Sequence, residues 1–223
     1  MNALQAALVD WVVRGTEPPA SIYPRLANGD LAADTKEAMG FPAIPGAPGP
    51  TGMAVGLMDY DYGSSLDYND FSGSIARQPP AIRQIIPAMM PKVNQDGNET
   101  VGIGSVLHQA PLGTYTGWNV IAAGFFKGQP CGGGLTGGYI PFAKTQAERL
   151  ASNDPRPSLE ERYGTHEGYV CRVKEIATQS VARRFLLQGD ADRLLAETQE
   201  SPVLLPASSG AQAKAVADRL CRR

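Results

Sequence analysis

The sequence predicts a mixed α+β fold whose helices and strands occupy different parts of the chain. A helical apolar stripe opens the chain, a glycine- and proline-rich region follows, and helical patterns dominate the final part. Its 223 residues are expected to form a single unit. Within that unit we expect a helix over 1–15, an extended and β region over 16–140, and a helical region over 141–223.

The first helix is predicted by four apolar residues at positions i, i+4, i+7 and i+8, which share one helical face. They are Leu4, Leu8, Trp11 and Val12, and we call them the α1 stripe from here on. Gly15 is expected to end the helix. The helix begins almost without a lead-in, so we expect that it once continued from something upstream.

The region from Glu17 to about Pro91 is dominated by proline, glycine and short polar residues, which favours an extended, wrapping path. Within it, 59–63 and the acidic residues up to Asp70 resemble a calcium loop in composition. They lack the Asp-x-Asp-x-Asp-Gly spacing and the terminal glutamate of an EF-hand, so we interpret them as an acidic, aromatic surface loop.

The clearest hairpin signal is a turn at 94–98 between Pro91–Val93 and Val101–Ile103, with the second strand continuing to Leu107. The segment 112–120 is rich in β-branched and aromatic residues and is predicted to be a strand or extended segment. The glycine-rich loop at 132–138 is not a phosphate loop, because neither Lys-Ser/Thr nor a helix follows it.

The final part is predicted to be helical. A short helix is expected from Thr145 to Leu150, and Ser158 with Glu161 forms a capping box that opens the next helix. That helix carries one apolar stripe, with a kink at Gly164 or Gly168. The stripe comprises Leu159, Tyr163, His166, Val170, Val173, Ala177 and Val181. Two further helices are expected, one capped by Asp190 and running to Glu200, the other capped by Ser208 or Ser209 and running to Leu220.

Composition excludes several classes of function. A net charge of −2, with no dense run of lysine and arginine, disfavours a nucleic-acid partner. No apolar run is long enough to span a membrane, and no signal peptide is visible, which predicts a cytoplasmic location. The cysteines are odd in number and lack a CxxC spacing, so we expect free thiols, no metal site and no cofactor. These cysteines are Cys131, Cys171 and Cys221.

Catalytic residues are hard to find in this sequence. No serine lies in the Gly-x-Ser-x-Gly frame of a nucleophile elbow, and Gly63–Asp67 comes closest. His166 is a candidate catalytic base, but its place on an apolar stripe favours a structural histidine held by a backbone carbonyl or carboxylate. His108 is interpreted as a loop histidine that follows a strand. A paired-carboxylate glycosidase stays an open alternative, although no pair is singled out.

Several blocks of the chain, taken in order, resemble the C-terminal region of a family of bacterial α/β-hydrolase-domain proteins. The blocks are Trp11–Ser21 with Tyr23-Pro24, Gly40–Pro42, Val93–Glu99, Thr114–Asn119 and Ile140–Gly164, the last within a longer matching block that runs to Val170. The resemblance implies a serine-type hydrolase, with esters as the expected small-molecule substrates. It also implies that the nucleophile serine and the triad histidine lie upstream of the part matching Trp11, outside this chain.

By this resemblance the helix over 1–15 belongs with a hydrolase core, and the chain is inactive alone. Tyr115, Thr116, Trp118 and Asn119 are candidates for the substrate entrance, because aromatic rings beside hydroxyl and amide groups suit a small-molecule pocket. The alternative is that Tyr115 and Trp118 are core aromatics. The expected partner is the upstream hydrolase half or a second copy of the chain.

Two other functions stay open at this point. One is an accessory or interaction protein derived from the family. The other is a free-standing hydrolase that uses a serine and His166 in an unfamiliar geometry. If the chain is part of a larger fold, the α1 stripe is expected to lack a full packing partner and to form an open patch or a dimer contact.

Overall fold

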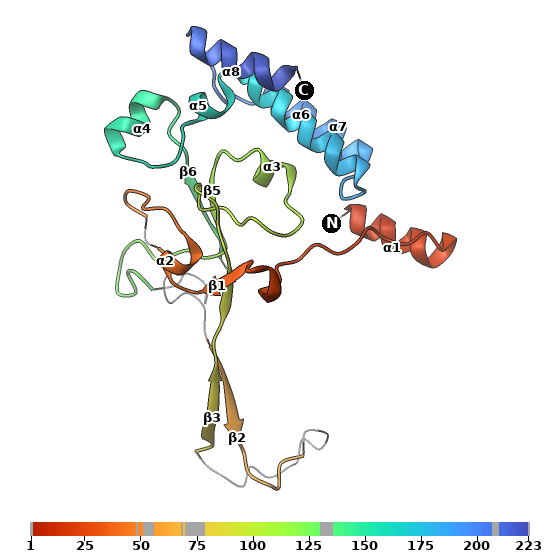
Figure 1. Ribbon diagram of the computed structural model, residues 1–223, viewed down its shortest axis with the longest axis vertical. Helices are drawn as coiled ribbons and strands as arrows, with labels where there is room; N and C mark the ends of the chain where they lie inside the picture. Colours follow the sequence, from red (N-terminus) through yellow and green to blue (C-terminus); the bar gives the residue numbers. More distant parts are fainter. Residues whose placement is uncertain are drawn as a thin grey trace.

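The computed structural model of the chain describes residues 2–47, 49–50, 56–67, 69, 79–129, 136–206 and 210–222. Helices and small antiparallel sheets alternate along it, so the predicted mixed α+β class is confirmed. Figure 1 shows the C-terminal helices at one end of the molecule and a long β-hairpin projecting from the other end. No described helix is long and apolar enough to cross a membrane.

The predicted first helix forms as α1 (Asn2–Arg14), and Gly15 ends it with a positive φ of 68°. Its buried residues are Ala3 and Ala7. The α1 stripe is far more open, with exposed fractions of 50% for Leu4, 57% for Leu8, 52% for Trp11 and 75% for Val12. The stripe therefore lacks a full packing partner within the described chain, as expected for part of a larger fold.

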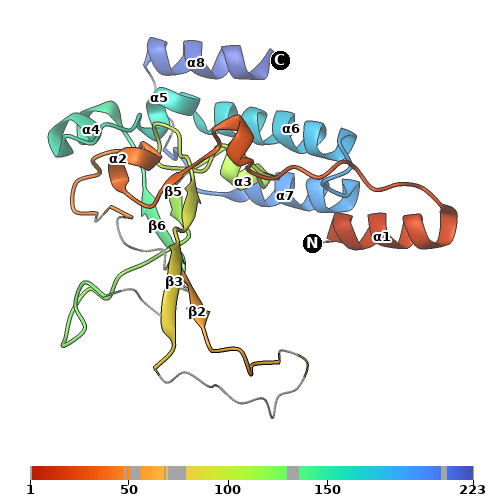
Figure 2. The ribbon, with the colours of Figure 1, turned by 60° about the horizontal axis from the view of Figure 1, so that its bottom comes forward.

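Helix α1 is attached to the body mainly at its start. The Asn2 amide donates to both carboxylate oxygens of Asp190, at 3.2 and 3.0 Å. The rest of α1 extends sideways from the helical end of the molecule in both views (Figures 1 and 2). This attachment by one end explains why the apolar face of α1 stays uncovered.

Two small sheets arise from the glycine- and proline-rich region. Strand β1 (Leu31–Ala33) pairs antiparallel with β4 (Met89–Pro91), and β2 (Leu57–Asp61) pairs with β3 (Ala81–Ile86) in the projecting hairpin. The short 3₁₀ helix η1 (Leu26–Asn28) precedes β1, and helix α2 (Lys36–Met39), which Thr35 caps, follows β1.

The interpretation of 59–63 as a surface loop is wrong for its first three residues, which lie in β2. Alternation along the strand places Asp59 and Asp61 on one face. Arg83 on β3 pairs with both carboxylates, at 3.8 and 3.4 Å. These cross-strand pairs favour a strand where composition alone favoured a loop. Tyr68 and Asp70 lie outside the described residues.

The predicted hairpin at 91–107 forms only in part. The turn at 94–98 closes as expected, with a single bridge between Val93 and Glu99. The chain then leaves the sheet, because Gly102 adopts a φ of 115° and Ser105 caps helix α3 (Val106–Gln109). The expected second strand is therefore wrong, and β4 pairs with β1 instead. The strand predicted within 112–120 forms as β5 (Gly113–Thr116) and pairs with β6 (Gly138–Pro141).

The C-terminal helices begin where capping chemistry predicts. Helix α4 (Gln146–Ser152) has a capping box of Thr145 and Glu148, and α5 (Leu159–Tyr163) has the predicted box of Ser158 and Glu161. The expected long helix divides at Gly164, with a φ of 73°, and resumes as α6 (His166–Ala182).

Helix α7 (Gln188–Glu200) follows, with Asp190 in its first turn and Leu187 at the N-cap position. Helix α8 (Ala211–Cys221) has Gly210 at its N-cap. The proposed caps Ser208 and Ser209, and most of the glycine-rich loop at 132–138, lie outside the described residues.

The main core lies between α3, α5, α6 and α7, and its largest fully buried side chains are Val173 and Ile176. A smaller cluster joins Phe41 and Ile44 to Trp118 beside β5. Helix α8 crosses the α5–α6 junction closely, since a Cβ at Gly164 would lie 2.0 Å from the Ala213 carbonyl oxygen. Only glycine permits this approach.

The close packing of α8 on α6 brings Cys171 and Cys221 together as a disulfide, with their Cα atoms 5.1 Å apart. The prediction that these two cysteines are free thiols is therefore wrong. The sequence hides the pair because 50 residues separate its members and no local spacing marks them. Cys131 lies outside the described residues.

We predict that Cys171→Ser will destabilise the chain and release α8. Closing a loop of 50 residues in the unfolded chain accounts for about 4 kcal/mol in the chain-entropy account of disulfides. Thermal unfolding of the oxidised protein and the variant measures the loss, and Cys131→Ser is the matched control because it leaves the bond intact. An unchanged melting temperature would show that the bond adds nothing to stability.

Candidate functional site

The site is built on a buried arginine, Arg156, which is only 2% exposed. Its guanidinium donates to both carboxylate oxygens of Asp154 at 2.6 to 3.2 Å. It also donates to the carbonyl oxygens of Ile140 at 3.0 Å and Pro141 at 3.1 Å, and to the Thr114 hydroxyl at 2.8 Å. Every guanidinium nitrogen is therefore engaged, so burial leaves no donor nitrogen unsatisfied.

The turn at 94–98 is held against β5 by a second buried side chain, Asn98, which is 1% exposed. Its amide donates to the Gly113 carbonyl at 3.0 Å, and its oxygen accepts from the Tyr115 backbone N–H at 2.8 Å. The Thr114 hydroxyl donates to the Asp96 carbonyl oxygen. The turn therefore keeps a fixed position relative to Arg156.

The Asp96 carboxylate projects from this turn and pairs with Arg162 on α5, with one contact at 2.9 Å. The Arg162 guanidinium lies over the Phe142 ring at 4.1 Å and also donates to the Pro157 carbonyl oxygen at 3.0 Å. Planar stacking together with paired hydrogen bonds is the geometry that arginine favours. The pair forms one wall of a cavity.

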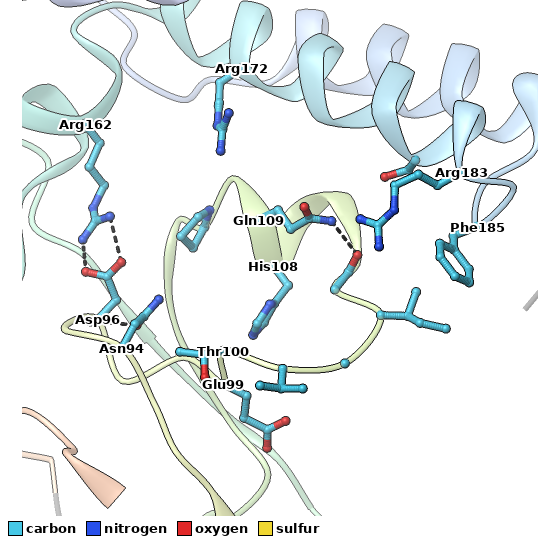
Figure 3. Close-up of a pocket in the computed structure, with 16 residues that line it drawn as sticks. Asn94, Asp96, Glu99, Thr100, His108, Gln109, Arg162, Arg172, Arg183 and Phe185 are labelled. Atoms are coloured by element: carbon cyan, nitrogen blue, oxygen red, sulfur yellow. Dashed lines mark hydrogen bonds and ion pairs between the residues drawn. The ribbon is translucent and has the colours of Figure 1, made fainter. Parts of the chain in front are cut away.

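This cavity, which we call the polar cavity, has a volume of about 520 Å³ and lies between the turn, α3 and α6. Figure 3 shows Arg172 and Arg183 reaching into it from α6 and its end, and His108 and Gln109 from α3. Its lining is mostly polar. The volume lies in the range of small-molecule pockets, which run from about 300 to 1,000 Å³.

The two histidines have different surroundings. His108 is half-buried in α3, not in a loop after a strand as predicted, and its ring lies 6.2 Å from the Tyr115 ring. The ring nitrogens of His166 face the Val203 and Gln199 carbonyl oxygens at 2.8 and 3.1 Å. These contacts match the expectation of a histidine held by backbone carbonyls, and they leave no ring nitrogen directed at a serine.

The four candidate entrance residues do not gather at one opening. The Tyr115 ring lies between the rings of Tyr139 and His108, and His108 lines the polar cavity. Trp118 is buried against Phe41, with ring centroids 5.8 Å apart. The Thr116 hydroxyl donates to the Trp118 carbonyl at 2.5 Å.

The last of the four, Asn119, accepts from the Val120 backbone N–H at 2.8 Å, so its side-chain oxygen stabilises the local chain. Tyr115 is thus the candidate whose ring neighbours a lining residue of the polar cavity, His108. The role of all four residues at a substrate entrance stays a prediction.

The polar cavity offers charged and hydrogen-bonding side chains to a ligand. Within the described chain, the His108 ring makes no hydrogen bond to a hydroxyl or carboxylate, so the paired nucleophile and base of a hydrolase are not assembled here. Burial and the neighbouring Tyr115 raise the pKa of Tyr139, which keeps its phenol protonated as a donor to the Leu112 carbonyl.

Sequence reasoning missed Arg156, Arg162 and Arg183, which set the charge and the shape of this region. Arg156 pairs with Asp154 two positions away, but Arg162 pairs with Asp96 66 positions away, and no local motif encodes a separation of that size. One signal was available, because Asp154-Pro155-Arg156 lies directly before the Ser158 capping box. The aspartate and the arginine form an ion pair there.

Comparison with known proteins identifies the class to which this chain belongs. The family model described as "Alpha/beta hydrolase domain" matches residues 1–196, which is most of the chain. The chain therefore belongs to the α/β-hydrolase-domain family, in agreement with the resemblance noted from its sequence blocks. The match ends within α7 and leaves α8 outside it. No curated protein and no solved structure matches the chain.

We predict that Arg156→Met will destabilise the protein by about 3–5 kcal/mol, because it leaves the buried Asp154 carboxylate without its partner. Chemical denaturation measures the change. Arg193→Met is the matched control, since Arg193 pairs with Asp190 at the exposed surface and its loss is expected to cost at most about 1 kcal/mol. Equal losses in the two variants would contradict the central role of Arg156.

Acid is expected to destabilise the same region. Burial opposes ionisation of Asp154 and Glu161, but their hydrogen bonds with Arg156, Ser158 and Arg149 outweigh it and hold the pKa of both carboxyls below ordinary values. Groups with a lowered pKa in the folded state stabilise it above the unfolded pKa, and this contribution disappears as the pH falls through the folded value.

We therefore predict that the free energy of unfolding decreases as the pH falls below 4.5, the ordinary value for glutamate. Denaturation at a series of pH values measures the slope. Glu161→Gln should lower stability at neutral pH and flatten the slope. A slope that Glu161→Gln does not alter would remove Glu161 from the acid response.

Proposed function

We propose that this chain is the part of a serine-type ester hydrolase that packs on the catalytic core, with the nucleophile serine and the triad histidine supplied from outside it. Family membership supports the hydrolase class. The absence of a Gly-x-Ser-x-Gly frame from the sequence supports an external nucleophile. The observation that carries the proposal is the open α1 stripe.

Further exposed apolar residues on α1 support the same proposal. Val9 and Val13 are 55% and 73% exposed, so they enlarge the open apolar surface beside the α1 stripe. A large apolar patch on such a surface is typical of a docking face.

In this proposal α1 docks on the hydrolase core through Leu8, Trp11 and Val12, and the polar cavity lies close to the entrance of the active site. Tyr115 is the member of the predicted entrance set that suits this role, because its ring neighbours His108 of the cavity lining. The chain alone has no hydrolase activity.

The second candidate function is a non-catalytic accessory protein derived from the family. The specific observation that favours it is the self-sufficient helical body. That body has its own core, and every buried side-chain nitrogen and oxygen among the described residues has a hydrogen-bond partner. An accessory protein would use the α1 stripe to bind a partner or a second copy of the chain.

The disulfide supports a different compartment from the one that the lack of a visible signal peptide predicts. Bonds such as Cys171–Cys221 form and persist in oxidising environments and are rare in the cytosol. The cytoplasmic location expected from the sequence stays a prediction, and the disulfide favours an oxidising compartment over it.

We predict that the purified chain will not cleave p-nitrophenyl acetate above the buffer rate. Activity is expected when it is co-expressed with the segment encoded directly upstream, provided that this segment carries Gly-x-Ser-x-Gly and a later histidine. Leu8→Asp should abolish the association, because it places a charge in the docking face. Leu150→Asp on α4 is the matched control, since Leu150 is equally exposed.

The outcomes separate the candidates. Ester cleavage by the chain alone that is lost on His166→Ala would overturn the proposal in favour of a free-standing hydrolase. The accessory function would be supported if the chain self-associates with rising concentration, if Leu8→Asp removes this association, and if the upstream segment lacks Gly-x-Ser-x-Gly.

A further inference from the structure

Two hollows of different character meet beside α3. One is the polar cavity, and the other is a mainly apolar hollow of about 420 Å³, which we call the apolar groove. They share four lining residues, which are Ile103, Gly104, Ser180 and Phe185. A single elongated molecule therefore has a continuous path from a polar surface to an apolar one.

The positive charges of the polar cavity are unequally neutralised. Arg162 is paired with Asp96, and Arg172 is paired with Glu175 at 2.7 Å. Arg183 lies over the Phe185 ring at 5.3 Å, and within the described chain it has no carboxylate partner. It is the uncompensated cation of the cavity.

The remaining carboxylate of the lining is Glu99, which Figure 3 places on the opposite wall from Arg183. Ser180 also lines this cavity, and Figure 3 shows the Gln109 side chain on the same side as Arg183. The cavity thus offers one free guanidinium with neutral polar groups close by, which suits an anion of a single charge.

The apolar groove supplies the complementary surface. Its aliphatic lining comes from α1, α3 and α7 and from the connection between α6 and α7, and comprises Leu4, Val106, Leu107, Leu186 and Leu194. Phe185 stands where the groove joins the polar cavity. An alkyl chain placed there would leave water for an apolar surface, at roughly 0.8 kcal/mol per buried CH₂.

We propose that these two hollows form one binding site for an organic monocarboxylate with an apolar tail, with the carboxylate at Arg183 and the tail along the groove. A singly charged head fits better than a doubly charged phosphate, because Arg183 is the one uncompensated cation within the described lining. Carboxylate and guanidinium also match in shape and form paired hydrogen bonds. This proposal concerns binding and holds under either proposed function.

The test is isothermal titration calorimetry of the full chain with decanoate. We expect saturable binding of one molecule, weakened about fivefold or more by Arg183→Gln, because charge-assisted hydrogen bonds are lost. Arg83→Gln is the matched control, since it removes the same charge from the distant hairpin and should leave the affinity unchanged. The exposure of Arg183 allows its replacement without unfolding, which the melting temperature checks.

Three further probes test each part of the ligand. Acetate lacks the tail, decyltrimethylammonium reverses the charge, and decyl phosphate carries a double charge, so all three should bind more weakly than decanoate. Leu107→Asn should weaken decanoate binding from the tail side. The proposal fails if decanoate does not bind, if Arg183→Gln and Arg83→Gln behave alike, or if decyltrimethylammonium binds as tightly as decanoate.

Discussion

The Arg156 guanidinium joins three parts of the chain that are far apart in sequence. It reaches the Thr114 hydroxyl on β5, two carbonyl oxygens of β6 and the Asp154 carboxylate before α5. A two-stranded sheet such as β5–β6 is marginal in water without a packing partner. Arg156 supplies that partner by fixing the sheet to the start of the helical body, which is why a charge is retained in so dry a place.

The same arginine sets the geometry of the cavity through a chain of contacts. Thr114 accepts from Arg156 and donates to the Asp96 carbonyl, so the position of the 94–98 turn depends on the arginine. The Asp96 carboxylate in turn holds Arg162 over Phe142. Buried polar networks of this kind are rigid when every member is satisfied. The shape of the cavity wall therefore depends on the hydrogen bonds of Arg156, although Arg156 does not line the cavity.

Local features of this fold could be predicted from the sequence, and long-range features could not. The capping box of Ser158 and Glu161 was predicted because its members are three residues apart and their chemistry acts within one turn. The strand after the 94–98 turn was mispredicted, because apolar residues at 101–107 suit a strand as well as a short capped helix. Ser105 decides between them by accepting from the His108 backbone N–H.

The candidate site was harder to predict than the fold for the same physical reason. The composition of 114–119 makes Tyr115 and Trp118 equal candidates, but Tyr115 neighbours His108 of the cavity lining and Trp118 is buried against Phe41. Aromatic residues serve both purposes, and only tertiary contacts distinguish them. The disulfide, Arg156 and Arg162 depend on pairings across the fold, which neither spacing nor periodicity records.

Leu4 connects the two proposals, because it belongs to the α1 stripe and also lines the apolar groove. A core that docks on α1 would cover the open side of this groove, so docking and carboxylate binding would share one surface residue. Free energies of binding at sites that share a contact are coupled, and the coupling is reciprocal. A carboxylate whose tail adds apolar surface to the docking face would strengthen association with the hydrolase core. A carboxylate that displaces Leu4 would weaken that association. Since ester hydrolysis releases a carboxylate, the sign of this coupling decides whether such a product would hold the proposed assembly together or help to separate it.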